Sequence, residues 1–522
     1  MSKTHAEIRN ENLERELFII TDEMKQAMEI AKVKQIEELP KIEEIQTIER
    51  NNFRSYDQDQ SFFVVVTKDK FLDTEHPAAI IDAIVERLDL RKIYEVYSLE
   101  GNPPYHPKMM LKILFYAYYI STRSCRLIWD AVINRSDFIY LAAGQVPNFR
   151  TINNFRLRHL KDLPYLFTQI EMMCKKLGLI GFEHLAVDGE KIQANASFKK
   201  SKNIKGIKKE YEKIKEGMEK LLNKDVNEYF TEEIKEKRVQ RLSEKLDKLE
   251  TFKKQLEEIG DKEKRINMTD SDANNMTHKD GSKKPSYNHQ SARDGKYGIV
   301  TAVQTTDTND KPEDLLKIID KSIENTGEKH EEITADCGFC DYDILQEVEE
   351  KRTEEFYLPD RRYETSKNGE TKSGKYHIEK FTKDESDDYV CPAGLKMKYI
   401  QTKEYEDGHT VTVYEGIGCE NCDKKEKCTK GKKRRINVDS RVIYRDEMRE
   451  KLKSEKGRET YMKRQGLIEP VHGDDQKNKG WIQHHLRGAF KAAMEFVLIR
   501  ITTNLGIMIK HKRNEILEWA GT

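Results

Sequence analysis

Two aspartates each follow a short apolar segment that is typical of a β-strand. Asp188 follows HLAV and precedes Gly189, and Asp336 follows EEITA and precedes Cys337 and Gly338. Ligands and metals gather at the carboxyl ends of strands in α/β sheets, and neighbouring carboxylates repel unless a cation lies between them. The pair therefore predicts a site for a divalent cation such as Mg²⁺. For either residue alone the alternative is a simple turn.

A third carboxylate is expected in the segment YMKRQGLIEPVHGDD, which contains Glu469, Asp474 and Asp475. Glu469 precedes Pro470, whose ring disfavours a regular helix through this point. We therefore predict that Glu469 lies at a helix kink or junction, where its side chain can turn inward. The alternative is an exposed glutamate at a helix end, which the pattern alone favours.

Four cysteines in a polar, glycine-containing segment have the spacing of a metal knuckle. Two residues separate Cys419 from Cys422, Cys428 follows, and Cys391 lies upstream in CPAG. Thiolates at this spacing can bind one tetrahedral ion, and four of them complete a zinc site. Because the segment has little core of its own, Zn²⁺ would supply folding energy. The alternative is a flexible loop with unpaired thiols, and the adjacent basic run 430–435 is either a phosphate contact or a solvated loop.

Composition and charge narrow the class of protein only partly. Lys+Arg and Asp+Glu balance at 93 each, so the total charge neither supports nor excludes a nucleic-acid partner. The polar N-terminus has no apolar stretch behind it, and Arg500 and Asn504 interrupt the apolar run 496–509. We therefore expect no signal peptide and no membrane span, and a cytoplasmic location.

The periodicity of apolar residues predicts an α/β protein. Strand patterns occur at 184–187, 295–308, 331–336 and 354–359, and helix patterns at 311–327, 342–352, 443–465 and 482–512. Residues 277–294 are polar and indicate a loop. The predicted segments are an N-terminal amphipathic helical segment (1–75), a helical domain (76–178), an α/β core (179–198 and 266–360), an inserted helical arm (199–265), an inserted Cys-bearing β-rich subdomain (361–440) and C-terminal helices completing the core (441–522). For the helical domain, a helix-turn-helix-like DNA-binding domain and an ordinary helical bundle are alternatives, and the pattern alone favours the bundle.

Several motifs in this order resemble the DDE transposases of bacterial insertion sequences. HPKMMLKILFYAY and PNFRTINNFRLRH resemble the family's N-terminal domain, and LAVDGEKIQANAS resembles the segment of its first aspartate. TDSDANNM with YNHQSARD resembles the link into its second strand, and ITADCGFCDYDIL resembles the segment of its second aspartate. YMKRQGLIEPVHG followed by NKGWIQHHLRGAFKA resembles the signature around its catalytic glutamate.

The resemblance implies an RNase H-like core and a Mg²⁺-dependent (or Mn²⁺-dependent) enzyme that uses two ions. It implies that Asp188, Asp336 and Glu469 form the metal-binding catalytic triad. Relatives often carry a lysine where this chain has Gln476, so either Lys477 or Lys479 substitutes for it or the contact is missing. The implied DNA-binding residues are Tyr461, Arg464, Lys477, Lys479 and Arg487.

The implied reaction cuts double-stranded DNA at the ends of the element and joins the freed 3′-OH to target DNA. A homodimer is expected, because two element ends must be held together. Two other classes of protein remain as alternatives. One is a non-catalytic DNA-binding protein derived from a transposase, and the other is a helical scaffold protein, which the coiled-coil-like segments favour.

Overall fold

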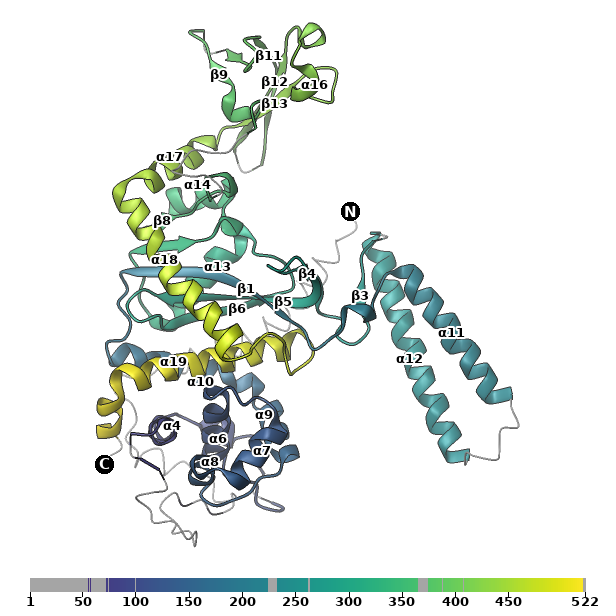
Figure 1. Cartoon of the computed structure of the whole chain (residues 1–522), viewed down its shortest axis with the longest axis vertical. Helices are drawn as coiled ribbons and strands as arrows, with labels where there is room; N and C mark the ends of the chain where they lie inside the picture. The colour runs from purple at the N-terminus through teal and green to yellow at the C-terminus, as the bar shows by residue number, and fades with distance from the viewer. Residues whose placement is uncertain are drawn as a thin grey trace.

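The computed structural model is a mixed α/β protein in which a central sheet lies between a helical block and a smaller β-rich part (Figure 1). The structure describes residues 55, 57, 72–73, 75–98, 100–223, 232–261, 263–364, 374–386, 388–406 and 408–519. The amphipathic helix predicted within residues 1–50 lies outside these ranges.

The helical block combines the first described helices with the last one. Its helices are α4 (Pro77–Glu86), α5 (Arg91–Tyr94), α6 (Pro107–Tyr119), α7 (Cys125–Asn134), α8 (Ser136–Leu141), α9 (Phe149–Arg158), α10 (Leu163–Lys176) and α19 (Ala489–Trp519). Pro77 and Pro107 occupy first-turn positions, where a missing N–H costs nothing. Apolar residues of α19 share one core with α4, α6 and α10. By length and composition α19 could cross a membrane, but 83% of its apolar window is buried inside the protein, as in a core helix.

The central sheet has both antiparallel and parallel strands. Its members are β1 (His184–Gln193), β4 (Asn274–Thr277), β5 (Lys283–Asp294), β6 (Val300–Thr306), β7 (Glu332–Ala335) and β8 (Glu355–Tyr357). The order is β4-β5-β1-β7-β8, and β6 pairs with β5. β5 is antiparallel to β1, β4 and β6, whereas β1, β7 and β8 run parallel.

Helices cover the sheet and connect its parallel strands. They are α13 (Pro312–Thr326), α14 (Tyr342–Lys351), α17 (Val442–Lys453) and α18 (Glu455–Gly473). Apolar residues of α13, α14 and α17 form a second core with β1, β7 and β8. A single helix over 443–465 was predicted, and this prediction was wrong. The chain breaks at Ser454, whose side chain accepts a hydrogen bond from the Gly457 N–H and caps α18.

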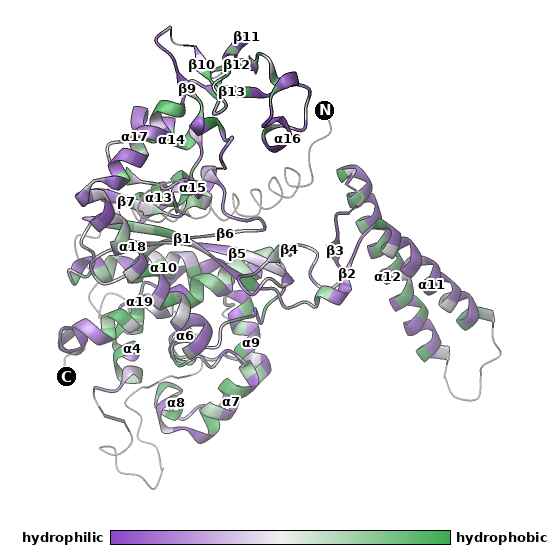
Figure 2. Ribbon diagram, turned by 45° about the horizontal axis from the view of Figure 1, so that its top comes forward, coloured by the Kyte–Doolittle hydropathy of each residue, from purple (hydrophilic) through white to green (hydrophobic). Residues whose placement is uncertain are grey.

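Two structures project from the sheet (Figure 2). The helix pair predicted by the heptad-like pattern is present as α11 (Ile204–Asn223) and α12 (Glu232–Ile259), with β2 (Ser201–Lys202) and β3 (Ile266–Asn267) at its base. The second part contains β9 (Thr382–Lys383), β10 (Tyr389–Val390), β11 (Met397–Glu404), β12 (Thr410–Gly416), β13 (Arg435–Asp439) and the helices α15 (Arg361–Glu364) and α16 (Lys425–Cys428). Its core is small, as the polar composition predicted.

Candidate active site

Asp188 and Asp336 lie side by side on neighbouring parallel strands. The register pairs Val187 with Ala335, so the next residue on each chain segment is an aspartate. Asp336 directly follows β7, as predicted, and its side chain accepts a hydrogen bond from the Gly338 N–H at 2.8 Å. The prediction for Asp188 was wrong in one respect. β1 does not end there but continues to Gln193 alongside β5, and only its pairing with β7 stops.

Burial and neighbouring negative charge disfavour the charged forms of both carboxylates. Burial raises the pKa of Asp336 to about 6, and the negative charges of Asp188 and Asp310 contribute to the rise. Burial also raises the pKa of Asp188, although the nearby guanidinium of Arg464 opposes this. A site that holds carboxylates this unfavourably is suited to a divalent cation.

Arg464 reaches the aspartates from α18, which packs against β1 and β7. Its Nη2 lies 2.6 Å from Oδ1 of Asp188, and both side chains are nearly buried. The guanidinium also lies over the ring of Tyr461, 5.9 Å from the centroid, and that ring packs against the second core. Tyr461 and Arg464 therefore lie on one face of α18, and Arg464 connects this face to the aspartates.

Glu469 is exposed on the same helix and has no described contact with either aspartate. A helix kink or junction was predicted at Glu469, whereas α18 continues through Pro470 to Gly473 and is followed by a π-turn, Asp474–Asn478. Glu469 follows Ile468, which faces inward and is buried. Because successive helical residues differ by about 100°, Glu469 points away from that face.

The predicted basic residues follow Glu469 in different environments. Lys477 is exposed in the π-turn. Lys479 forms ion pairs with Asp474 at 2.8 Å and with Asp475 at 3.4 Å. Arg487 is exposed and donates to the backbone carbonyl of Asn195 at 3.1 Å.

A buried charge network, which the sequence did not reveal, holds this segment on β1. Arg500 of α19 binds Oδ2 of Asp475 at 2.6 Å and also pairs with Glu190. All three side chains are buried, and burial raises the pKa of Glu190 to about 7. Asp475 therefore has a structural partner, and the network ties the π-turn to the strand that carries Asp188.

A third carboxylate near the pair was also missed. Asp310 lies between β6 and α13, in the segment TNDKPED, and its charge acts on both Asp188 and Asp336. No strand pattern leads directly into it, so no sequence signal distinguished it from a solvated loop aspartate.

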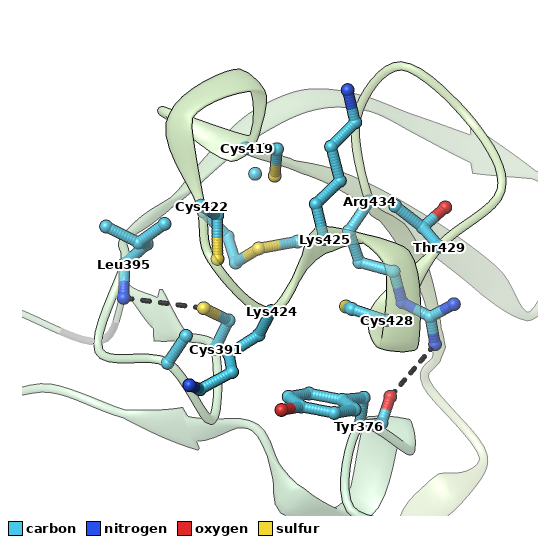
Figure 3. A pocket seen from close by; sticks show the side chains of 13 residues that line it. Tyr376, Cys391, Leu395, Cys419, Cys422, Lys424, Lys425, Cys428, Thr429 and Arg434 are labelled. Carbon is cyan, nitrogen blue, oxygen red and sulfur yellow. Dashed lines mark hydrogen bonds between the residues drawn. The ribbon is translucent and has the colours of Figure 1, made fainter.

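The four predicted zinc ligands meet around one small cavity (Figure 3). The cavity has a volume of about 20 Å³, enough for one water-sized particle. Sγ of Cys391 accepts a hydrogen bond from the Leu395 N–H at 3.4 Å. Burial raises the pKa of Cys428, and the other three thiols contribute to the rise. Four convergent thiols fit the donor set of a Cys₄ zinc site.

Neither cluster is a preformed metal cage. Over the described ranges, no three His, Cys, Asp or Glu side chains have a geometry that would hold a metal ion as they stand. In both places an ion would have to draw the donor groups together.

Comparison with known protein families assigns the chain to a class. Residues 66–158 match a transposase domain (DUF772), and residues 390–509 match the transposase DDE domain. Both matches support a DDE transposase of the insertion-sequence type. The first match covers α4 to α9, and the second covers the cysteine cluster, Arg464 and Glu469. Asp188 and Asp336 lie outside both matches.

No curated protein and no solved structure matches the transposase. Transposases act on DNA, and enzymes with a DDE domain use divalent metal ions in general. The class of the protein therefore rests on the two family matches, and the assignment of individual residues rests on the geometry described above.

Proposed function

We propose that the chain cuts DNA at the ends of an insertion sequence and joins the freed 3′-OH to target DNA. The observation that carries this proposal is the pair Asp188 and Asp336, adjacent in register and faced by Arg464. The match to the transposase DDE domain supports the same chemistry independently.

The sheet supports an RNase H-like core. Three antiparallel strands, β6-β5-β1, continue into two parallel ones, β7 and β8, with helices on the sheet. This is the arrangement that the family resemblance implies. Within it, α11 and α12 leave the core after β1, and the cysteine-bearing strands leave it after β8.

The proposed metal ligands are Asp188, Asp336 and Glu469, and the residues present fit hard oxygen-binding cations. Two Mg²⁺ or Mn²⁺ ions bound there would activate the attacking oxygen and neutralise the scissile phosphate. In the first step the oxygen of water bonds to phosphorus, the bond to the 3′ oxygen breaks, and that oxygen takes a proton. In the second step the freed 3′-OH attacks a target phosphodiester in the same way. The chain's task is to position and neutralise charge.

Arg464 and the segment after Glu469 would hold the DNA. A guanidinium binds a phosphate through two parallel hydrogen bonds, so Arg464 can exchange its contact with Asp188 for one with the backbone of the element end. Lys477, Lys479 and Arg487, which follow Glu469 along the chain, are the other proposed DNA contacts. The cysteine cluster would hold one Zn²⁺ that stabilises its small subdomain, and a cytoplasmic homodimer would bring two ends together.

The second candidate is a non-catalytic DNA-binding protein derived from a transposase. One observation favours it, namely that Glu469 faces solvent without a described contact to the aspartate pair. The two candidates differ in whether the protein cleaves DNA through the aspartate pair or only binds DNA.

The test is cleavage of a DNA fragment that carries the element's own ends, with Mg²⁺ present. Wild type and Asp336→Ala are compared, with Asp320→Ala, an exposed aspartate of α13, as the matched control. Cleavage by wild type and the control only would support the proposal. Equal cleavage by Asp336→Ala would remove the site assignment, and specific binding without cleavage by any variant would favour the non-catalytic candidate.

A further inference from the structure

The loop between β6 and α13 delivers a third carboxylate, Asp310, to the edge of the aspartate pair. Its Oδ1 accepts hydrogen bonds from Nδ2 of Asn288 and from Nε2 of Gln290, both at 2.8 Å. Both amides belong to β5, the neighbour of β1. Two amide donors on one oxygen hold the carboxylate in a fixed place, although they are neutral and leave its negative charge uncompensated.

Glycines on both catalytic segments make room for this carboxylate. A Cβ added at Gly189, next to Asp188, would lie 2.2 Å from Oδ1 of Asp310. A Cβ added at Gly338, two residues after Asp336, would lie 3.2 Å from Cβ of Asp310 and 2.9 Å from Oδ1 of Asp336. The backbone therefore approaches Asp310 closely at both positions. The glycines serve this approach rather than an unusual backbone conformation, because neither has a positive φ.

Three carboxylates gather at this corner. Asp310 raises the pKa of both Asp188 and Asp336, so its charge acts on each of them. Arg464 forms an ion pair with Asp188, and the charge of Asp188 also acts on the buried guanidinium of Arg293 in β5. Glu469, the ligand implied by the family resemblance, is exposed on α18, whereas Asp310 lies beside both aspartates.

We propose that Asp310 is a further metal-binding carboxylate of the transposase site, held by Asn288 and Gln290 and acting together with Asp188 and Asp336. This inference rests on the proposed function, because the divalent ion belongs to the reaction proposed above. An ion that draws the three side chains inward would relieve their mutual repulsion, and carboxylate oxygens are the ligands that Mg²⁺ and Mn²⁺ accept.

The test is a titration of the whole chain with Mn²⁺, in which calorimetry measures the binding affinity. Asp310→Asn keeps the shape and the oxygen that accepts from β5 but removes the charge. Asp336→Asn serves as the reference for loss of a ligand, and Asp320→Asn as the control on α13. We expect Asp310→Asn to weaken Mn²⁺ binding by about 10- to 100-fold, the range for removing a group that supports a metal site. The control should bind as wild type does.

A second measurement separates a binding effect from misfolding. Melting temperatures with a chelator should not be lower for Asp310→Asn than for wild type, while the rise on adding Mn²⁺ should shrink. Mn²⁺ affinity of Asp310→Asn within twofold of wild type, with binding lost in Asp336→Asn, would overturn the inference and leave the proposed function intact. If Asp310→Asn loses Mn²⁺ binding while the wild-type protein cuts no end-bearing DNA, the inference is upheld and the proposed function is overturned.

Discussion

Replacing a proposed catalytic residue should stabilise the transposase. Asp336 is held at a raised pKa of about 6 because it is buried beside two other carboxylates. Its charged form is therefore disfavoured in the folded protein relative to the unfolded chain. Asp336→Asn removes the charge and keeps an oxygen that can accept from the Gly338 N–H. We expect this variant to be more stable than wild type when a chelator is present, although it loses cleavage.

The magnitude follows from the shift in pKa. The ordinary value is 3.8 and the value in the fold is about 6, and each unit corresponds to about 1.4 kcal/mol. The gain in the free energy of unfolding on removing the charge of Asp336 is therefore at most about 3 kcal/mol. Because the amide must be accommodated and the structure relaxes, a gain of about 1–3 kcal/mol above pH 7 is expected. For a domain of this size that raises the melting temperature by about 2–10 °C.

The dependence on pH gives the sharper test. A carboxyl group whose pKa is raised in the fold makes its full contribution to stability when the pH lies below its pKa in the unfolded chain. This contribution is lost as the pH rises through the pKa that the group has in the folded protein. The advantage of Asp336→Asn should therefore be full at pH 8, fall to about half by pH 5 and vanish below pH 4. Scanning calorimetry with a chelator measures this advantage. The control Asp320→Asn removes the ion pair between an exposed aspartate and Arg352, and it should show no such pattern. A variant no more stable than wild type at pH 8 would refute the reasoning.

Three further outcomes follow from the contacts. Cys422→Ser should abolish bound zinc measured by elemental analysis, whereas Cys125→Ser, in the helical block, should retain it; equal zinc in both would exclude the thiol cluster. Arg500→Met should lower the free energy of unfolding by about 3–5 kcal/mol in urea titrations, since it removes the buried cation that Asp475 and Glu190 share; a change below about 1 kcal/mol would show that the network is not charged. Arg464→Gln should raise the pH at which Mn²⁺ binding is half lost, since Arg464 lowers the pKa of Asp188; an unchanged pH midpoint would contradict this.

The sequence correctly predicted the type of those strands and helices whose buried side chains are apolar. The strands before Asp188 and Asp336 and the helix that begins at Pro312 have clear apolar periodicity, so their types were predicted correctly. The adjacency of the two aspartates depends on strand order and register, which no local pattern contains. This adjacency is a consequence of the parallel pairing of β1 with β7.

The largest failure was β5, which was predicted as a polar loop. The strand is buried along most of its length although its residues are polar. Tyr287 donates to Asp270, His289 bonds to Thr305 and Gln290 donates to Asp310. Polar side chains tolerate burial when each finds a partner, but those partners lie in segments far along the chain. Hydrophobicity alone therefore cannot identify such a strand. The inward position predicted for Glu469 is not observed, because Glu469 is exposed on a helix that continues through Pro470. Its role as a metal ligand stays a prediction.

The position of α19 determines how the chain can fold during synthesis. The last helix completes the core formed by α4, α6 and α10, and its Asn504 both donates to and accepts from the backbone of Val300 in β6. The core of the helical block can therefore close only after the whole central sheet has been synthesised, because α19 follows every strand of that sheet along the chain. We expect fragments that lack α19 to be unfolded, because they lose the helix that the block and the sheet share.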